Sequence, residues 1–319
     1  MIRWALSGPA LGAIVSIATL QGQDASLNRR DSGLLDPALR PEIGGQRRVL
    51  ESSGTAGRPS DTGVDDYGEQ EILVRVDEWQ PFAFGTSFSY EYQTNAALSP
   101  SGGEEDFLFR ESASGRGTFS MLPSLYADVG VRQQLYRYDE LDLLDYDRID
   151  VDAGILWVLP EFVPAILEGS VVTLKGTWYR MSEAGEFGEE LFANTGLNVG
   201  LLKSVPLSRN HSLLGNVTAD VSVDASEDAP QRHEYAALVA WQAQWAPRWE
   251  SSVFLRATLY DYHKHDDWNL IAAASIDYVV KPWCRIGLST SFSYNDSDVG
   301  PFDYENWTTG VNLRLSARF

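Results

Sequence analysis

The chain has 319 residues, of which 44% are hydrophobic and 12% aromatic, and its formal net charge is −20. A chain with this net negative charge repels polyanions over most of its surface. We therefore expect no nucleic-acid partner. The single cysteine, Cys284, excludes an intrachain disulfide. No run of residues after position 20 approaches the roughly 18 consecutive apolar residues that a membrane-spanning helix needs.

The first 80 residues do not show the pattern of a folded domain. Residues 1–25 have the features of a secretory signal, because Arg3 precedes an apolar core that is followed by small or polar residues. An uncleaved anchor helix is the alternative, but the core is short and Gly8-Pro9 interrupts it. Residues 26–80 are polar and rich in Gly, Pro, Ser and Arg, so they cannot bury a core. We therefore expect a signal peptide followed by a mostly disordered extension.

From Pro81 onward, apolar and polar residues alternate in segments of about 8 to 16 residues, close to the length that a tilted membrane strand requires. The segments cover residues 82–94, 114–121, 125–138, 147–159, 170–181, 189–203, 210–224, 233–245, 249–262, 267–280, 283–295 and 304–319. This pattern predicts an all-β protein. We expect a transmembrane, antiparallel, up-and-down β-barrel of about twelve strands over residues 81–319, preceded by a largely irregular N-terminal extension.

The last segment, from Tyr304 to Phe319, alternates strictly and stops on an aromatic residue. Leu313, Leu315 and Phe319 lie on its apolar side. This ending resembles the closing strand of Gram-negative outer-membrane β-barrel proteins of the porin-like kind, whose assembly machinery reads a terminal Phe preceded by apolar residues at every second position. The resemblance implies a location in the cell outer membrane, contact with its lipid and lipopolysaccharide, and recognition of these three residues by the barrel assembly machinery. It also places residues 26–80 in the periplasm.

The connections between segments give an independent test, because outer-membrane barrels have short periplasmic turns and longer external loops. With both termini periplasmic, the predicted turns are 122–124, 160–169, 204–209, 246–248 and 281–282. The predicted external loops are 95–113, 139–146, 182–188, 225–232, 263–266 and 296–303. Most of the external set is longer, as expected. The loops are also acidic, as in Glu104-Glu105-Asp106, which predicts a solvated rim rather than a metal site.

Charged residues gather on the strand faces opposite the apolar ones, and these faces should line the lumen. The candidates for the lumen or its constriction are Arg132, Lys175, Arg256, Asp150, Asp152, Asp220, Arg285 and Arg314. The first three fall near mid-height, where a ring of cations could select solutes by charge.

Two functions remain open at this point. The first is a narrow diffusion channel for small hydrophilic solutes, which small lumen residues such as Gly154 and Ser289 favour because they leave room for water. The second is a closed structural or adhesive barrel, in which mixed charges pair across a packed interior and the acidic external loops or the N-terminal extension bind a partner. A count of twelve strands does not decide between them, and the sequence does not indicate the oligomeric state.

Enzymatic patterns are weak. Asp261-Tyr262-His263, with Asp150 and Asp152 across the barrel, resembles the catalytic pairs of omptin proteases. That family has ten strands, however, and a two-residue match in an acidic loop arises easily by chance. We expect no catalytic residues, no metal and no cofactor.

Overall fold

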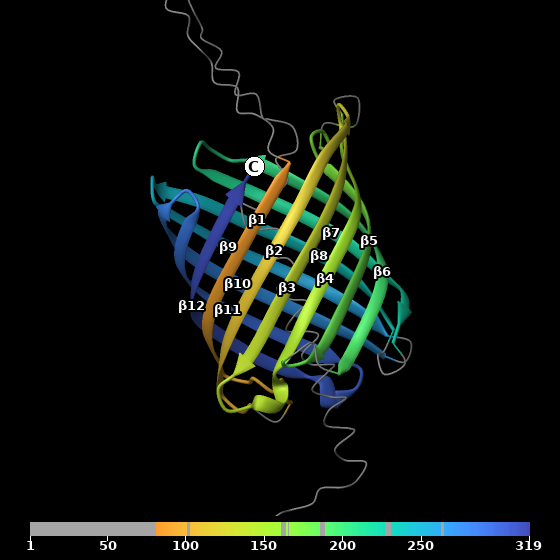
Figure 1. Cartoon of the computed structure of the whole chain (residues 1–319), viewed down its shortest axis with the longest axis vertical. Coiled ribbons are helices and arrows are strands. Elements are labelled where there is room, and N and C mark those ends of the chain that lie inside the picture. The colour runs from red at the N-terminus through yellow and green to blue at the C-terminus, as the bar shows by residue number, and fades with distance from the viewer. Residues whose placement is uncertain are drawn as a thin grey trace, which may run out of the picture.

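The computed structural model of the chain describes residues 81–100, 103–160, 164, 166–185, 189–226, 231–262 and 265–319. These residues form one closed antiparallel barrel in which each strand pairs with its neighbours in chain order (Figure 1). The strands are β1 (Phe82–Gln93), β2 (Asp106–Leu122), β3 (Leu125–Tyr138), β4 (Tyr146–Val158), β5 (Val171–Glu183), β6 (Glu190–Pro206), β7 (His211–Ala225), β8 (Arg232–Ala246), β9 (Trp249–Tyr262), β10 (His265–Lys281), β11 (Cys284–Ser297) and β12 (Tyr304–Arg318).

The all-β fold class and the twelve strands are confirmed. Within the described ranges, no helix is both long and apolar enough to cross a membrane. The predicted signal peptide over 1–25 and extension over 26–80 lie outside the described residues.

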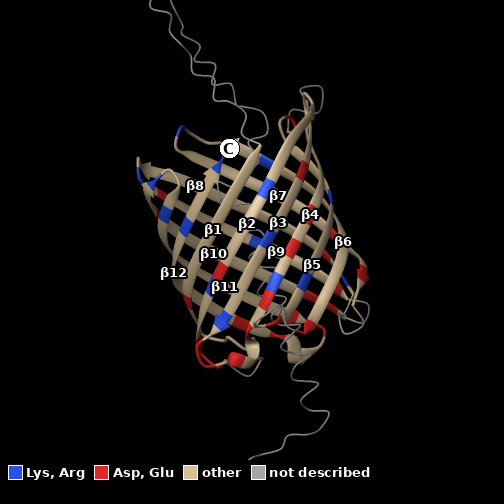
Figure 2. Ribbon diagram, viewed as in Figure 1, with Lys and Arg blue, Asp and Glu red and all other residues tan. Residues whose placement is uncertain are grey.

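The barrel has two different ends. At the terminal end, β1 begins beside the end of β12, and the backbones of Phe82 and Phe319 exchange hydrogen bonds of 3.1 and 3.0 Å (Figure 1). The opposite end, here called the loop end, carries two single turns of 3₁₀ helix, η1 (Asp142–Leu144) and η2 (Gly300–Phe302). Asp and Glu gather in the connections of the loop end, which forms an acidic rim (Figure 2).

The outward face of the wall is apolar over its middle. Alternate residues along each strand point outward, and among them Val131, Leu255 and Val311 have exposed fractions of 52%, 51% and 52%. Aromatic residues lie nearer the strand ends, such as Trp157, Trp249 and Trp307. A broad apolar band between aromatic belts is the exterior of a barrel that lies in a bilayer.

The prediction for the second strand needs a correction. Residues 95–113 were predicted as an external loop, whereas β2 begins at Asp106 and pairs with β1 from Asp106 to Gly117. The acidic run Glu104-Glu105-Asp106 hides this start, because its charges suggest a solvated loop. Pairing with β1 and β3 satisfies the backbone of residues 106–113, which outweighs the local polarity. The extension brings Arg110 from the predicted loop into the barrel wall.

Gly154 in β4 permits a close approach of the neighbouring backbone. A Cβ at this position would lie 2.1 Å from the carbonyl oxygen of Leu174 and 2.6 Å from the Cα of Lys175. These are backbone atoms of β5, so a side chain would have to push the two strands apart. Gly176, on the outward face of β5, is different, because its Cβ would meet a single atom at 3.9 Å.

These two glycines provide a matched test of wall packing. Gly154→Ala should lower the free energy of unfolding by about 1–3 kcal/mol because β4 and β5 must separate. Gly176→Ala should stay within about 0.5 kcal/mol of the parent. Urea unfolding of the refolded protein in lipid vesicles, followed by tryptophan fluorescence, measures both values. Equal effects of the two substitutions would show that the close approach at Gly154 is unimportant.

Candidate functional site: the barrel lumen

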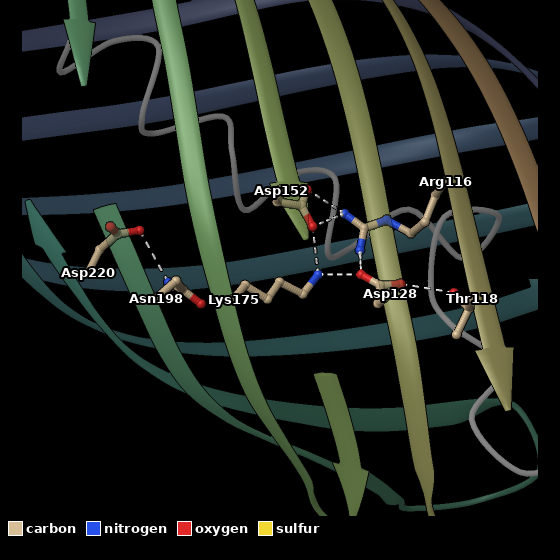
Figure 3. A network of polar contacts seen from close by, with 7 residues as sticks. All are labelled: Arg116, Thr118, Asp128, Asp152, Lys175, Asn198 and Asp220. Carbon is tan, nitrogen blue, oxygen red and sulfur yellow. Dashed lines mark hydrogen bonds and ion pairs between the residues drawn. The ribbon is translucent and has the colours of Figure 1, made fainter. Parts of the chain in front are cut away.

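Four charged side chains on β2, β3, β4 and β5 form a cluster on the inner wall (Figure 3). Lys175 donates hydrogen bonds to Asp128 at 2.5 Å and to Asp152 at 2.9 Å. Arg116 bonds the same two carboxylates, at 3.1 Å in the case of Asp152. Thr118 donates a further bond of 2.9 Å to Asp128, whose side chain is completely buried. Two cations and two carboxylates thus neutralise each other within the wall.

Glycines make this cluster possible, because two of its ion pairs, Arg116–Asp152 and Lys175–Asp128, cross over a strand. Arg116 on β2 and Asp152 on β4 both lie opposite Gly130 of β3. A Cβ at Gly130 would sit 2.7 Å from a carboxylate oxygen of Asp152 and 3.0 Å from a guanidinium nitrogen of Arg116. Gly154 occupies the same place between Asp128 and Lys175. Because each of these glycines has no side chain, a salt bridge can pass over it and lie flat along the wall.

Other inward-facing cations also have carboxylate partners. The ion pairs are Arg110–Glu91 at 3.0 Å, Arg148–Asp150 at 2.5 Å, Arg285–Glu250 at 3.4 Å, Arg256–Glu234 and Arg314–Asp277. The side chains of Arg148 and Arg256 are 1% and 2% exposed. Such deep burial of a guanidinium is tolerable because the partner carboxylate stays with it. Most of the charge in the lumen is consequently balanced in place.

The predicted site residues fall into two groups. Arg132, Arg285 and Arg314 line a cavity of about 470 Å³ inside the barrel. The other five belong to polar contacts within the wall, where Lys175 and Asp152 share the cluster and Asp220 accepts a bond of 3.2 Å from Asn198 (Figure 3). The structure therefore does not bring the eight residues together into one ring. Whether any of them forms a constriction stays a prediction.

Two adjoining cavities lie in the lumen among the residues that the structure describes. The larger one reaches from the turn Ser208–Asn210 at the terminal end into the middle of the barrel. A second cavity of about 150 Å³ continues toward the loop end, where Leu98 and Tyr304 line it. The lining residues that the two cavities share define a waist: Glu91, Arg110, Phe254, Ala273 and Ser289. A polar passage thus runs beside β7 to β12, β1 and β2.

The opposite wall is packed with aromatic residues near the loop end. Leu108, Tyr136, Tyr146, Tyr179, Met181 and Phe192 belong to one buried group. Tyr136 and Tyr146 stack with their ring centres 4.2 Å apart, and Arg148 lies 4.4 Å from the centre of the Tyr179 ring. Above them, burial raises the pKa of Asp145, although this carboxylate accepts a 2.7 Å hydrogen bond from the backbone of Tyr138. The open part of the lumen is therefore off-centre.

Several lumen residues were absent from the predicted site. Arg110 and Arg232 were predicted to lie in external loops, but they belong to β2 and β8. Arg232 is 6% exposed and stacks 4.2 Å from the centre of the Tyr260 ring. Glu234 and Arg148 lie within predicted strands, and the alternation alone places them on the inner face. The alternation of the second strand continues toward the N-terminus as far as Asp106. Following it past residue 114 would have placed Arg110 on the inner face.

Of the residues of the omptin-like pattern that the structure describes, Asp261 and Asp150 do not face each other across the lumen. Asp261 belongs to the outward-facing series of β9, between the buried Tyr260 and Tyr262. Asp150 points inward and accepts two hydrogen bonds from Arg148. His263 lies outside the described residues.

A closed barrel with an apolar exterior and a charge-balanced polar interior has the architecture of the outer-membrane β-barrel class. No protein-family model matches the sequence, and no curated protein matches it. Similar solved structures include outer-membrane channels. An outer-membrane channel from Pseudomonas putida F1 is 11% identical, with a TM-score of 0.48 over 75% of this chain and 97% of that one. At such low identity the similarity concerns the fold alone.

Two porins give the same picture. The NanC porin is 9% identical with a TM-score of 0.41, and the KdgM porin is 6% identical with a TM-score of 0.37. Each match covers 72% of this chain and 98% of the porin. The architecture of this barrel, rather than these low scores, carries the assignment to the class.

The charge cluster predicts a large effect of removing its lysine. Lys175→Met should lower the free energy of unfolding by about 3–5 kcal/mol, because the buried Asp128 and its neighbour Asp152 would then share Arg116 alone. Asp152→Asn in the same chain should recover part of the loss, since it restores the charge balance. Lys203→Met is the control, because Lys203 bonds a backbone carbonyl in an exposed place, and its effect should stay within about 0.5 kcal/mol. Urea unfolding in vesicles measures all three, and equal effects of the two lysine substitutions would contradict the account.

Proposed function

We propose that the barrel is a narrow diffusion channel that lets small hydrophilic solutes cross the outer membrane. The observation that carries the proposal is the pair of adjoining cavities with a shared waist at Glu91, Arg110, Phe254, Ala273 and Ser289. A row of polar side chains along this passage allows a solute to exchange its hydration for protein contacts. The loop end faces the exterior, and the terminal end faces the periplasm.

The location and the export route belong to the same proposal. Residues 1–25 serve as the export signal, residues 26–80 form a periplasmic extension, and Leu313, Leu315 and Phe319 are recognised by the assembly machinery. Outer-membrane lipid and lipopolysaccharide surround the apolar band. Fractionation of producing cells tests the location, and recovery of the protein from the inner membrane or the soluble fraction would refute it. The mass of the purified chain tests whether the signal is removed.

Planar-bilayer recording tests the channel and its waist together. The refolded protein should give small, stable current steps. Ala273→Phe should reduce the conductance about two-fold or more, because it adds a ring at the waist where a narrow pore has little room. Ala272→Phe, one residue along β10 and exposed on the outward face, should leave the conductance unchanged. Equal conductance of the two variants would place the ion path elsewhere.

A second candidate function is supported by the aromatic packing near the loop end. The buried group around Tyr136 and Tyr179 could close the barrel, and the acidic rim would then be the working surface of a structural or adhesive protein. A correctly folded barrel, recognised by its heat-modifiable migration, that carries no current would favour this candidate over the channel. We propose no enzymatic role.

A further inference from the structure

The charged groups that line the larger cavity mostly come with their own counter-charges. Three of its cations, Arg110, Arg285 and Arg314, are paired with Glu91, Glu250 and Asp277 of the same wall. A passing ion would have to compete with these internal partners for the cations.

Two further arginines line this cavity. Arg132 lies opposite Asp150 on the neighbouring strand β4, and Asp150 also accepts two hydrogen bonds from Arg148. Arg209 is exposed in the turn at the terminal end, where water solvates it. Three of the five lining arginines are thus paired and a fourth is solvated, so the cavity offers a charged solute little compensation for the water that the solute would lose.

Hydroxyl and amide groups make up much of the remaining lining. Ser212, Gln242, Ser252, Ser275 and Ser289 lie directly opposite one another across β7 to β11, and we call this series the serine row. All five line the cavity, and the hydroxyls of Ser252 and Ser275 are 2.8 Å apart.

A second group of polar residues faces the same space from the adjoining part of the wall. It consists of Ser87, Ser89, Ser112, Ser114, Gln134 and Asn312 on β1, β2, β3 and β12. A serine hydroxyl both donates and accepts, and a side-chain amide has both functions as well. The lining can therefore bond a hydroxyl in either orientation and from more than one side.

We propose that the solute of this passage is an uncharged polyhydroxylated molecule, such as a small sugar or polyol, and that the serine row binds it during transit. This inference rests on the proposed channel function and specifies its substrate class. The hydroxyls of such a solute exchange water for serine and glutamine contacts without loss of a charge–water interaction. A cavity of about 470 Å³ lies within the range of small-molecule sites, which is roughly 300–1,000 Å³.

Swelling of protein-containing liposomes in three solutes of equal ring size tests the proposal. Glucose should enter about two-fold or more faster than either glucuronate or glucosamine, because the charged solutes lose hydration without an available counter-charge. Faster entry of glucuronate or glucosamine than of glucose would overturn the assigned substrate class while leaving the channel in place. Absence of swelling in all three solutes would instead overturn the channel function itself.

A triple variant separates binding by the serine row from simple passage. Ser252→Ala, Ser275→Ala and Ser289→Ala together remove three hydroxyls and slightly widen the passage. The rate of glucose entry should fall about two-fold or more, because the lost hydrogen bonds each contribute about 1 kcal/mol, while the conductance to KCl should not fall. Ser222→Ala is the control, since this buried serine bonds Asn194 and does not line the cavity. Unchanged glucose entry in the triple variant would refute a role for the serine row.

Discussion

Hydrogen bonding between β1 and β12 closes the barrel, and the other features of the structure depend on this closure. The two strands pair from Ala83 opposite Arg318 to Gln93 opposite Thr308. In an apolar surrounding, an open sheet would leave two rows of unpaired backbone groups, each at a cost of several kcal/mol. Closure removes both edges. It also gives every strand one face toward a confined interior and one toward the apolar band.

The confined interior explains how its charges are arranged. A charged side chain that points into a narrow barrel reaches little bulk water, so it needs a partner nearby. Here the partner often stands two strands away, and the strand between contributes a glycine, as Gly130 does between Arg116 and Asp152. The cluster of four charged residues built in this way occupies the wall of β2 to β5. The free volume lies mainly beside β7 to β12, β1 and β2, where serines and alanines line the cavities.

Strand count, strand faces and most turns could be predicted from sequence because they follow from local alternation. The strict pattern before Phe319 fixed the direction of every other strand, and the alternation placed Lys175 and Arg256 on inner faces. Their partners could not be predicted, because Asp128 and Glu234 meet them through the register of neighbouring strands. Local charge also misled the prediction at β2. The acidic residues before Phe107 have the composition of a loop. Glu111 also interrupts the alternation, because it is a carboxylate on a mostly apolar outward face.

The most direct test of a passage with internally balanced charge is the reversal potential across a bilayer that separates unequal KCl solutions. Paired charges should give a potassium-to-chloride permeability ratio within about three-fold of one, because no uncompensated ring of charge surrounds the waist. A ratio beyond about ten-fold in either direction, equivalent to about 1.4 kcal/mol of discrimination, would contradict the account. It would show that one sign of charge dominates the ion path.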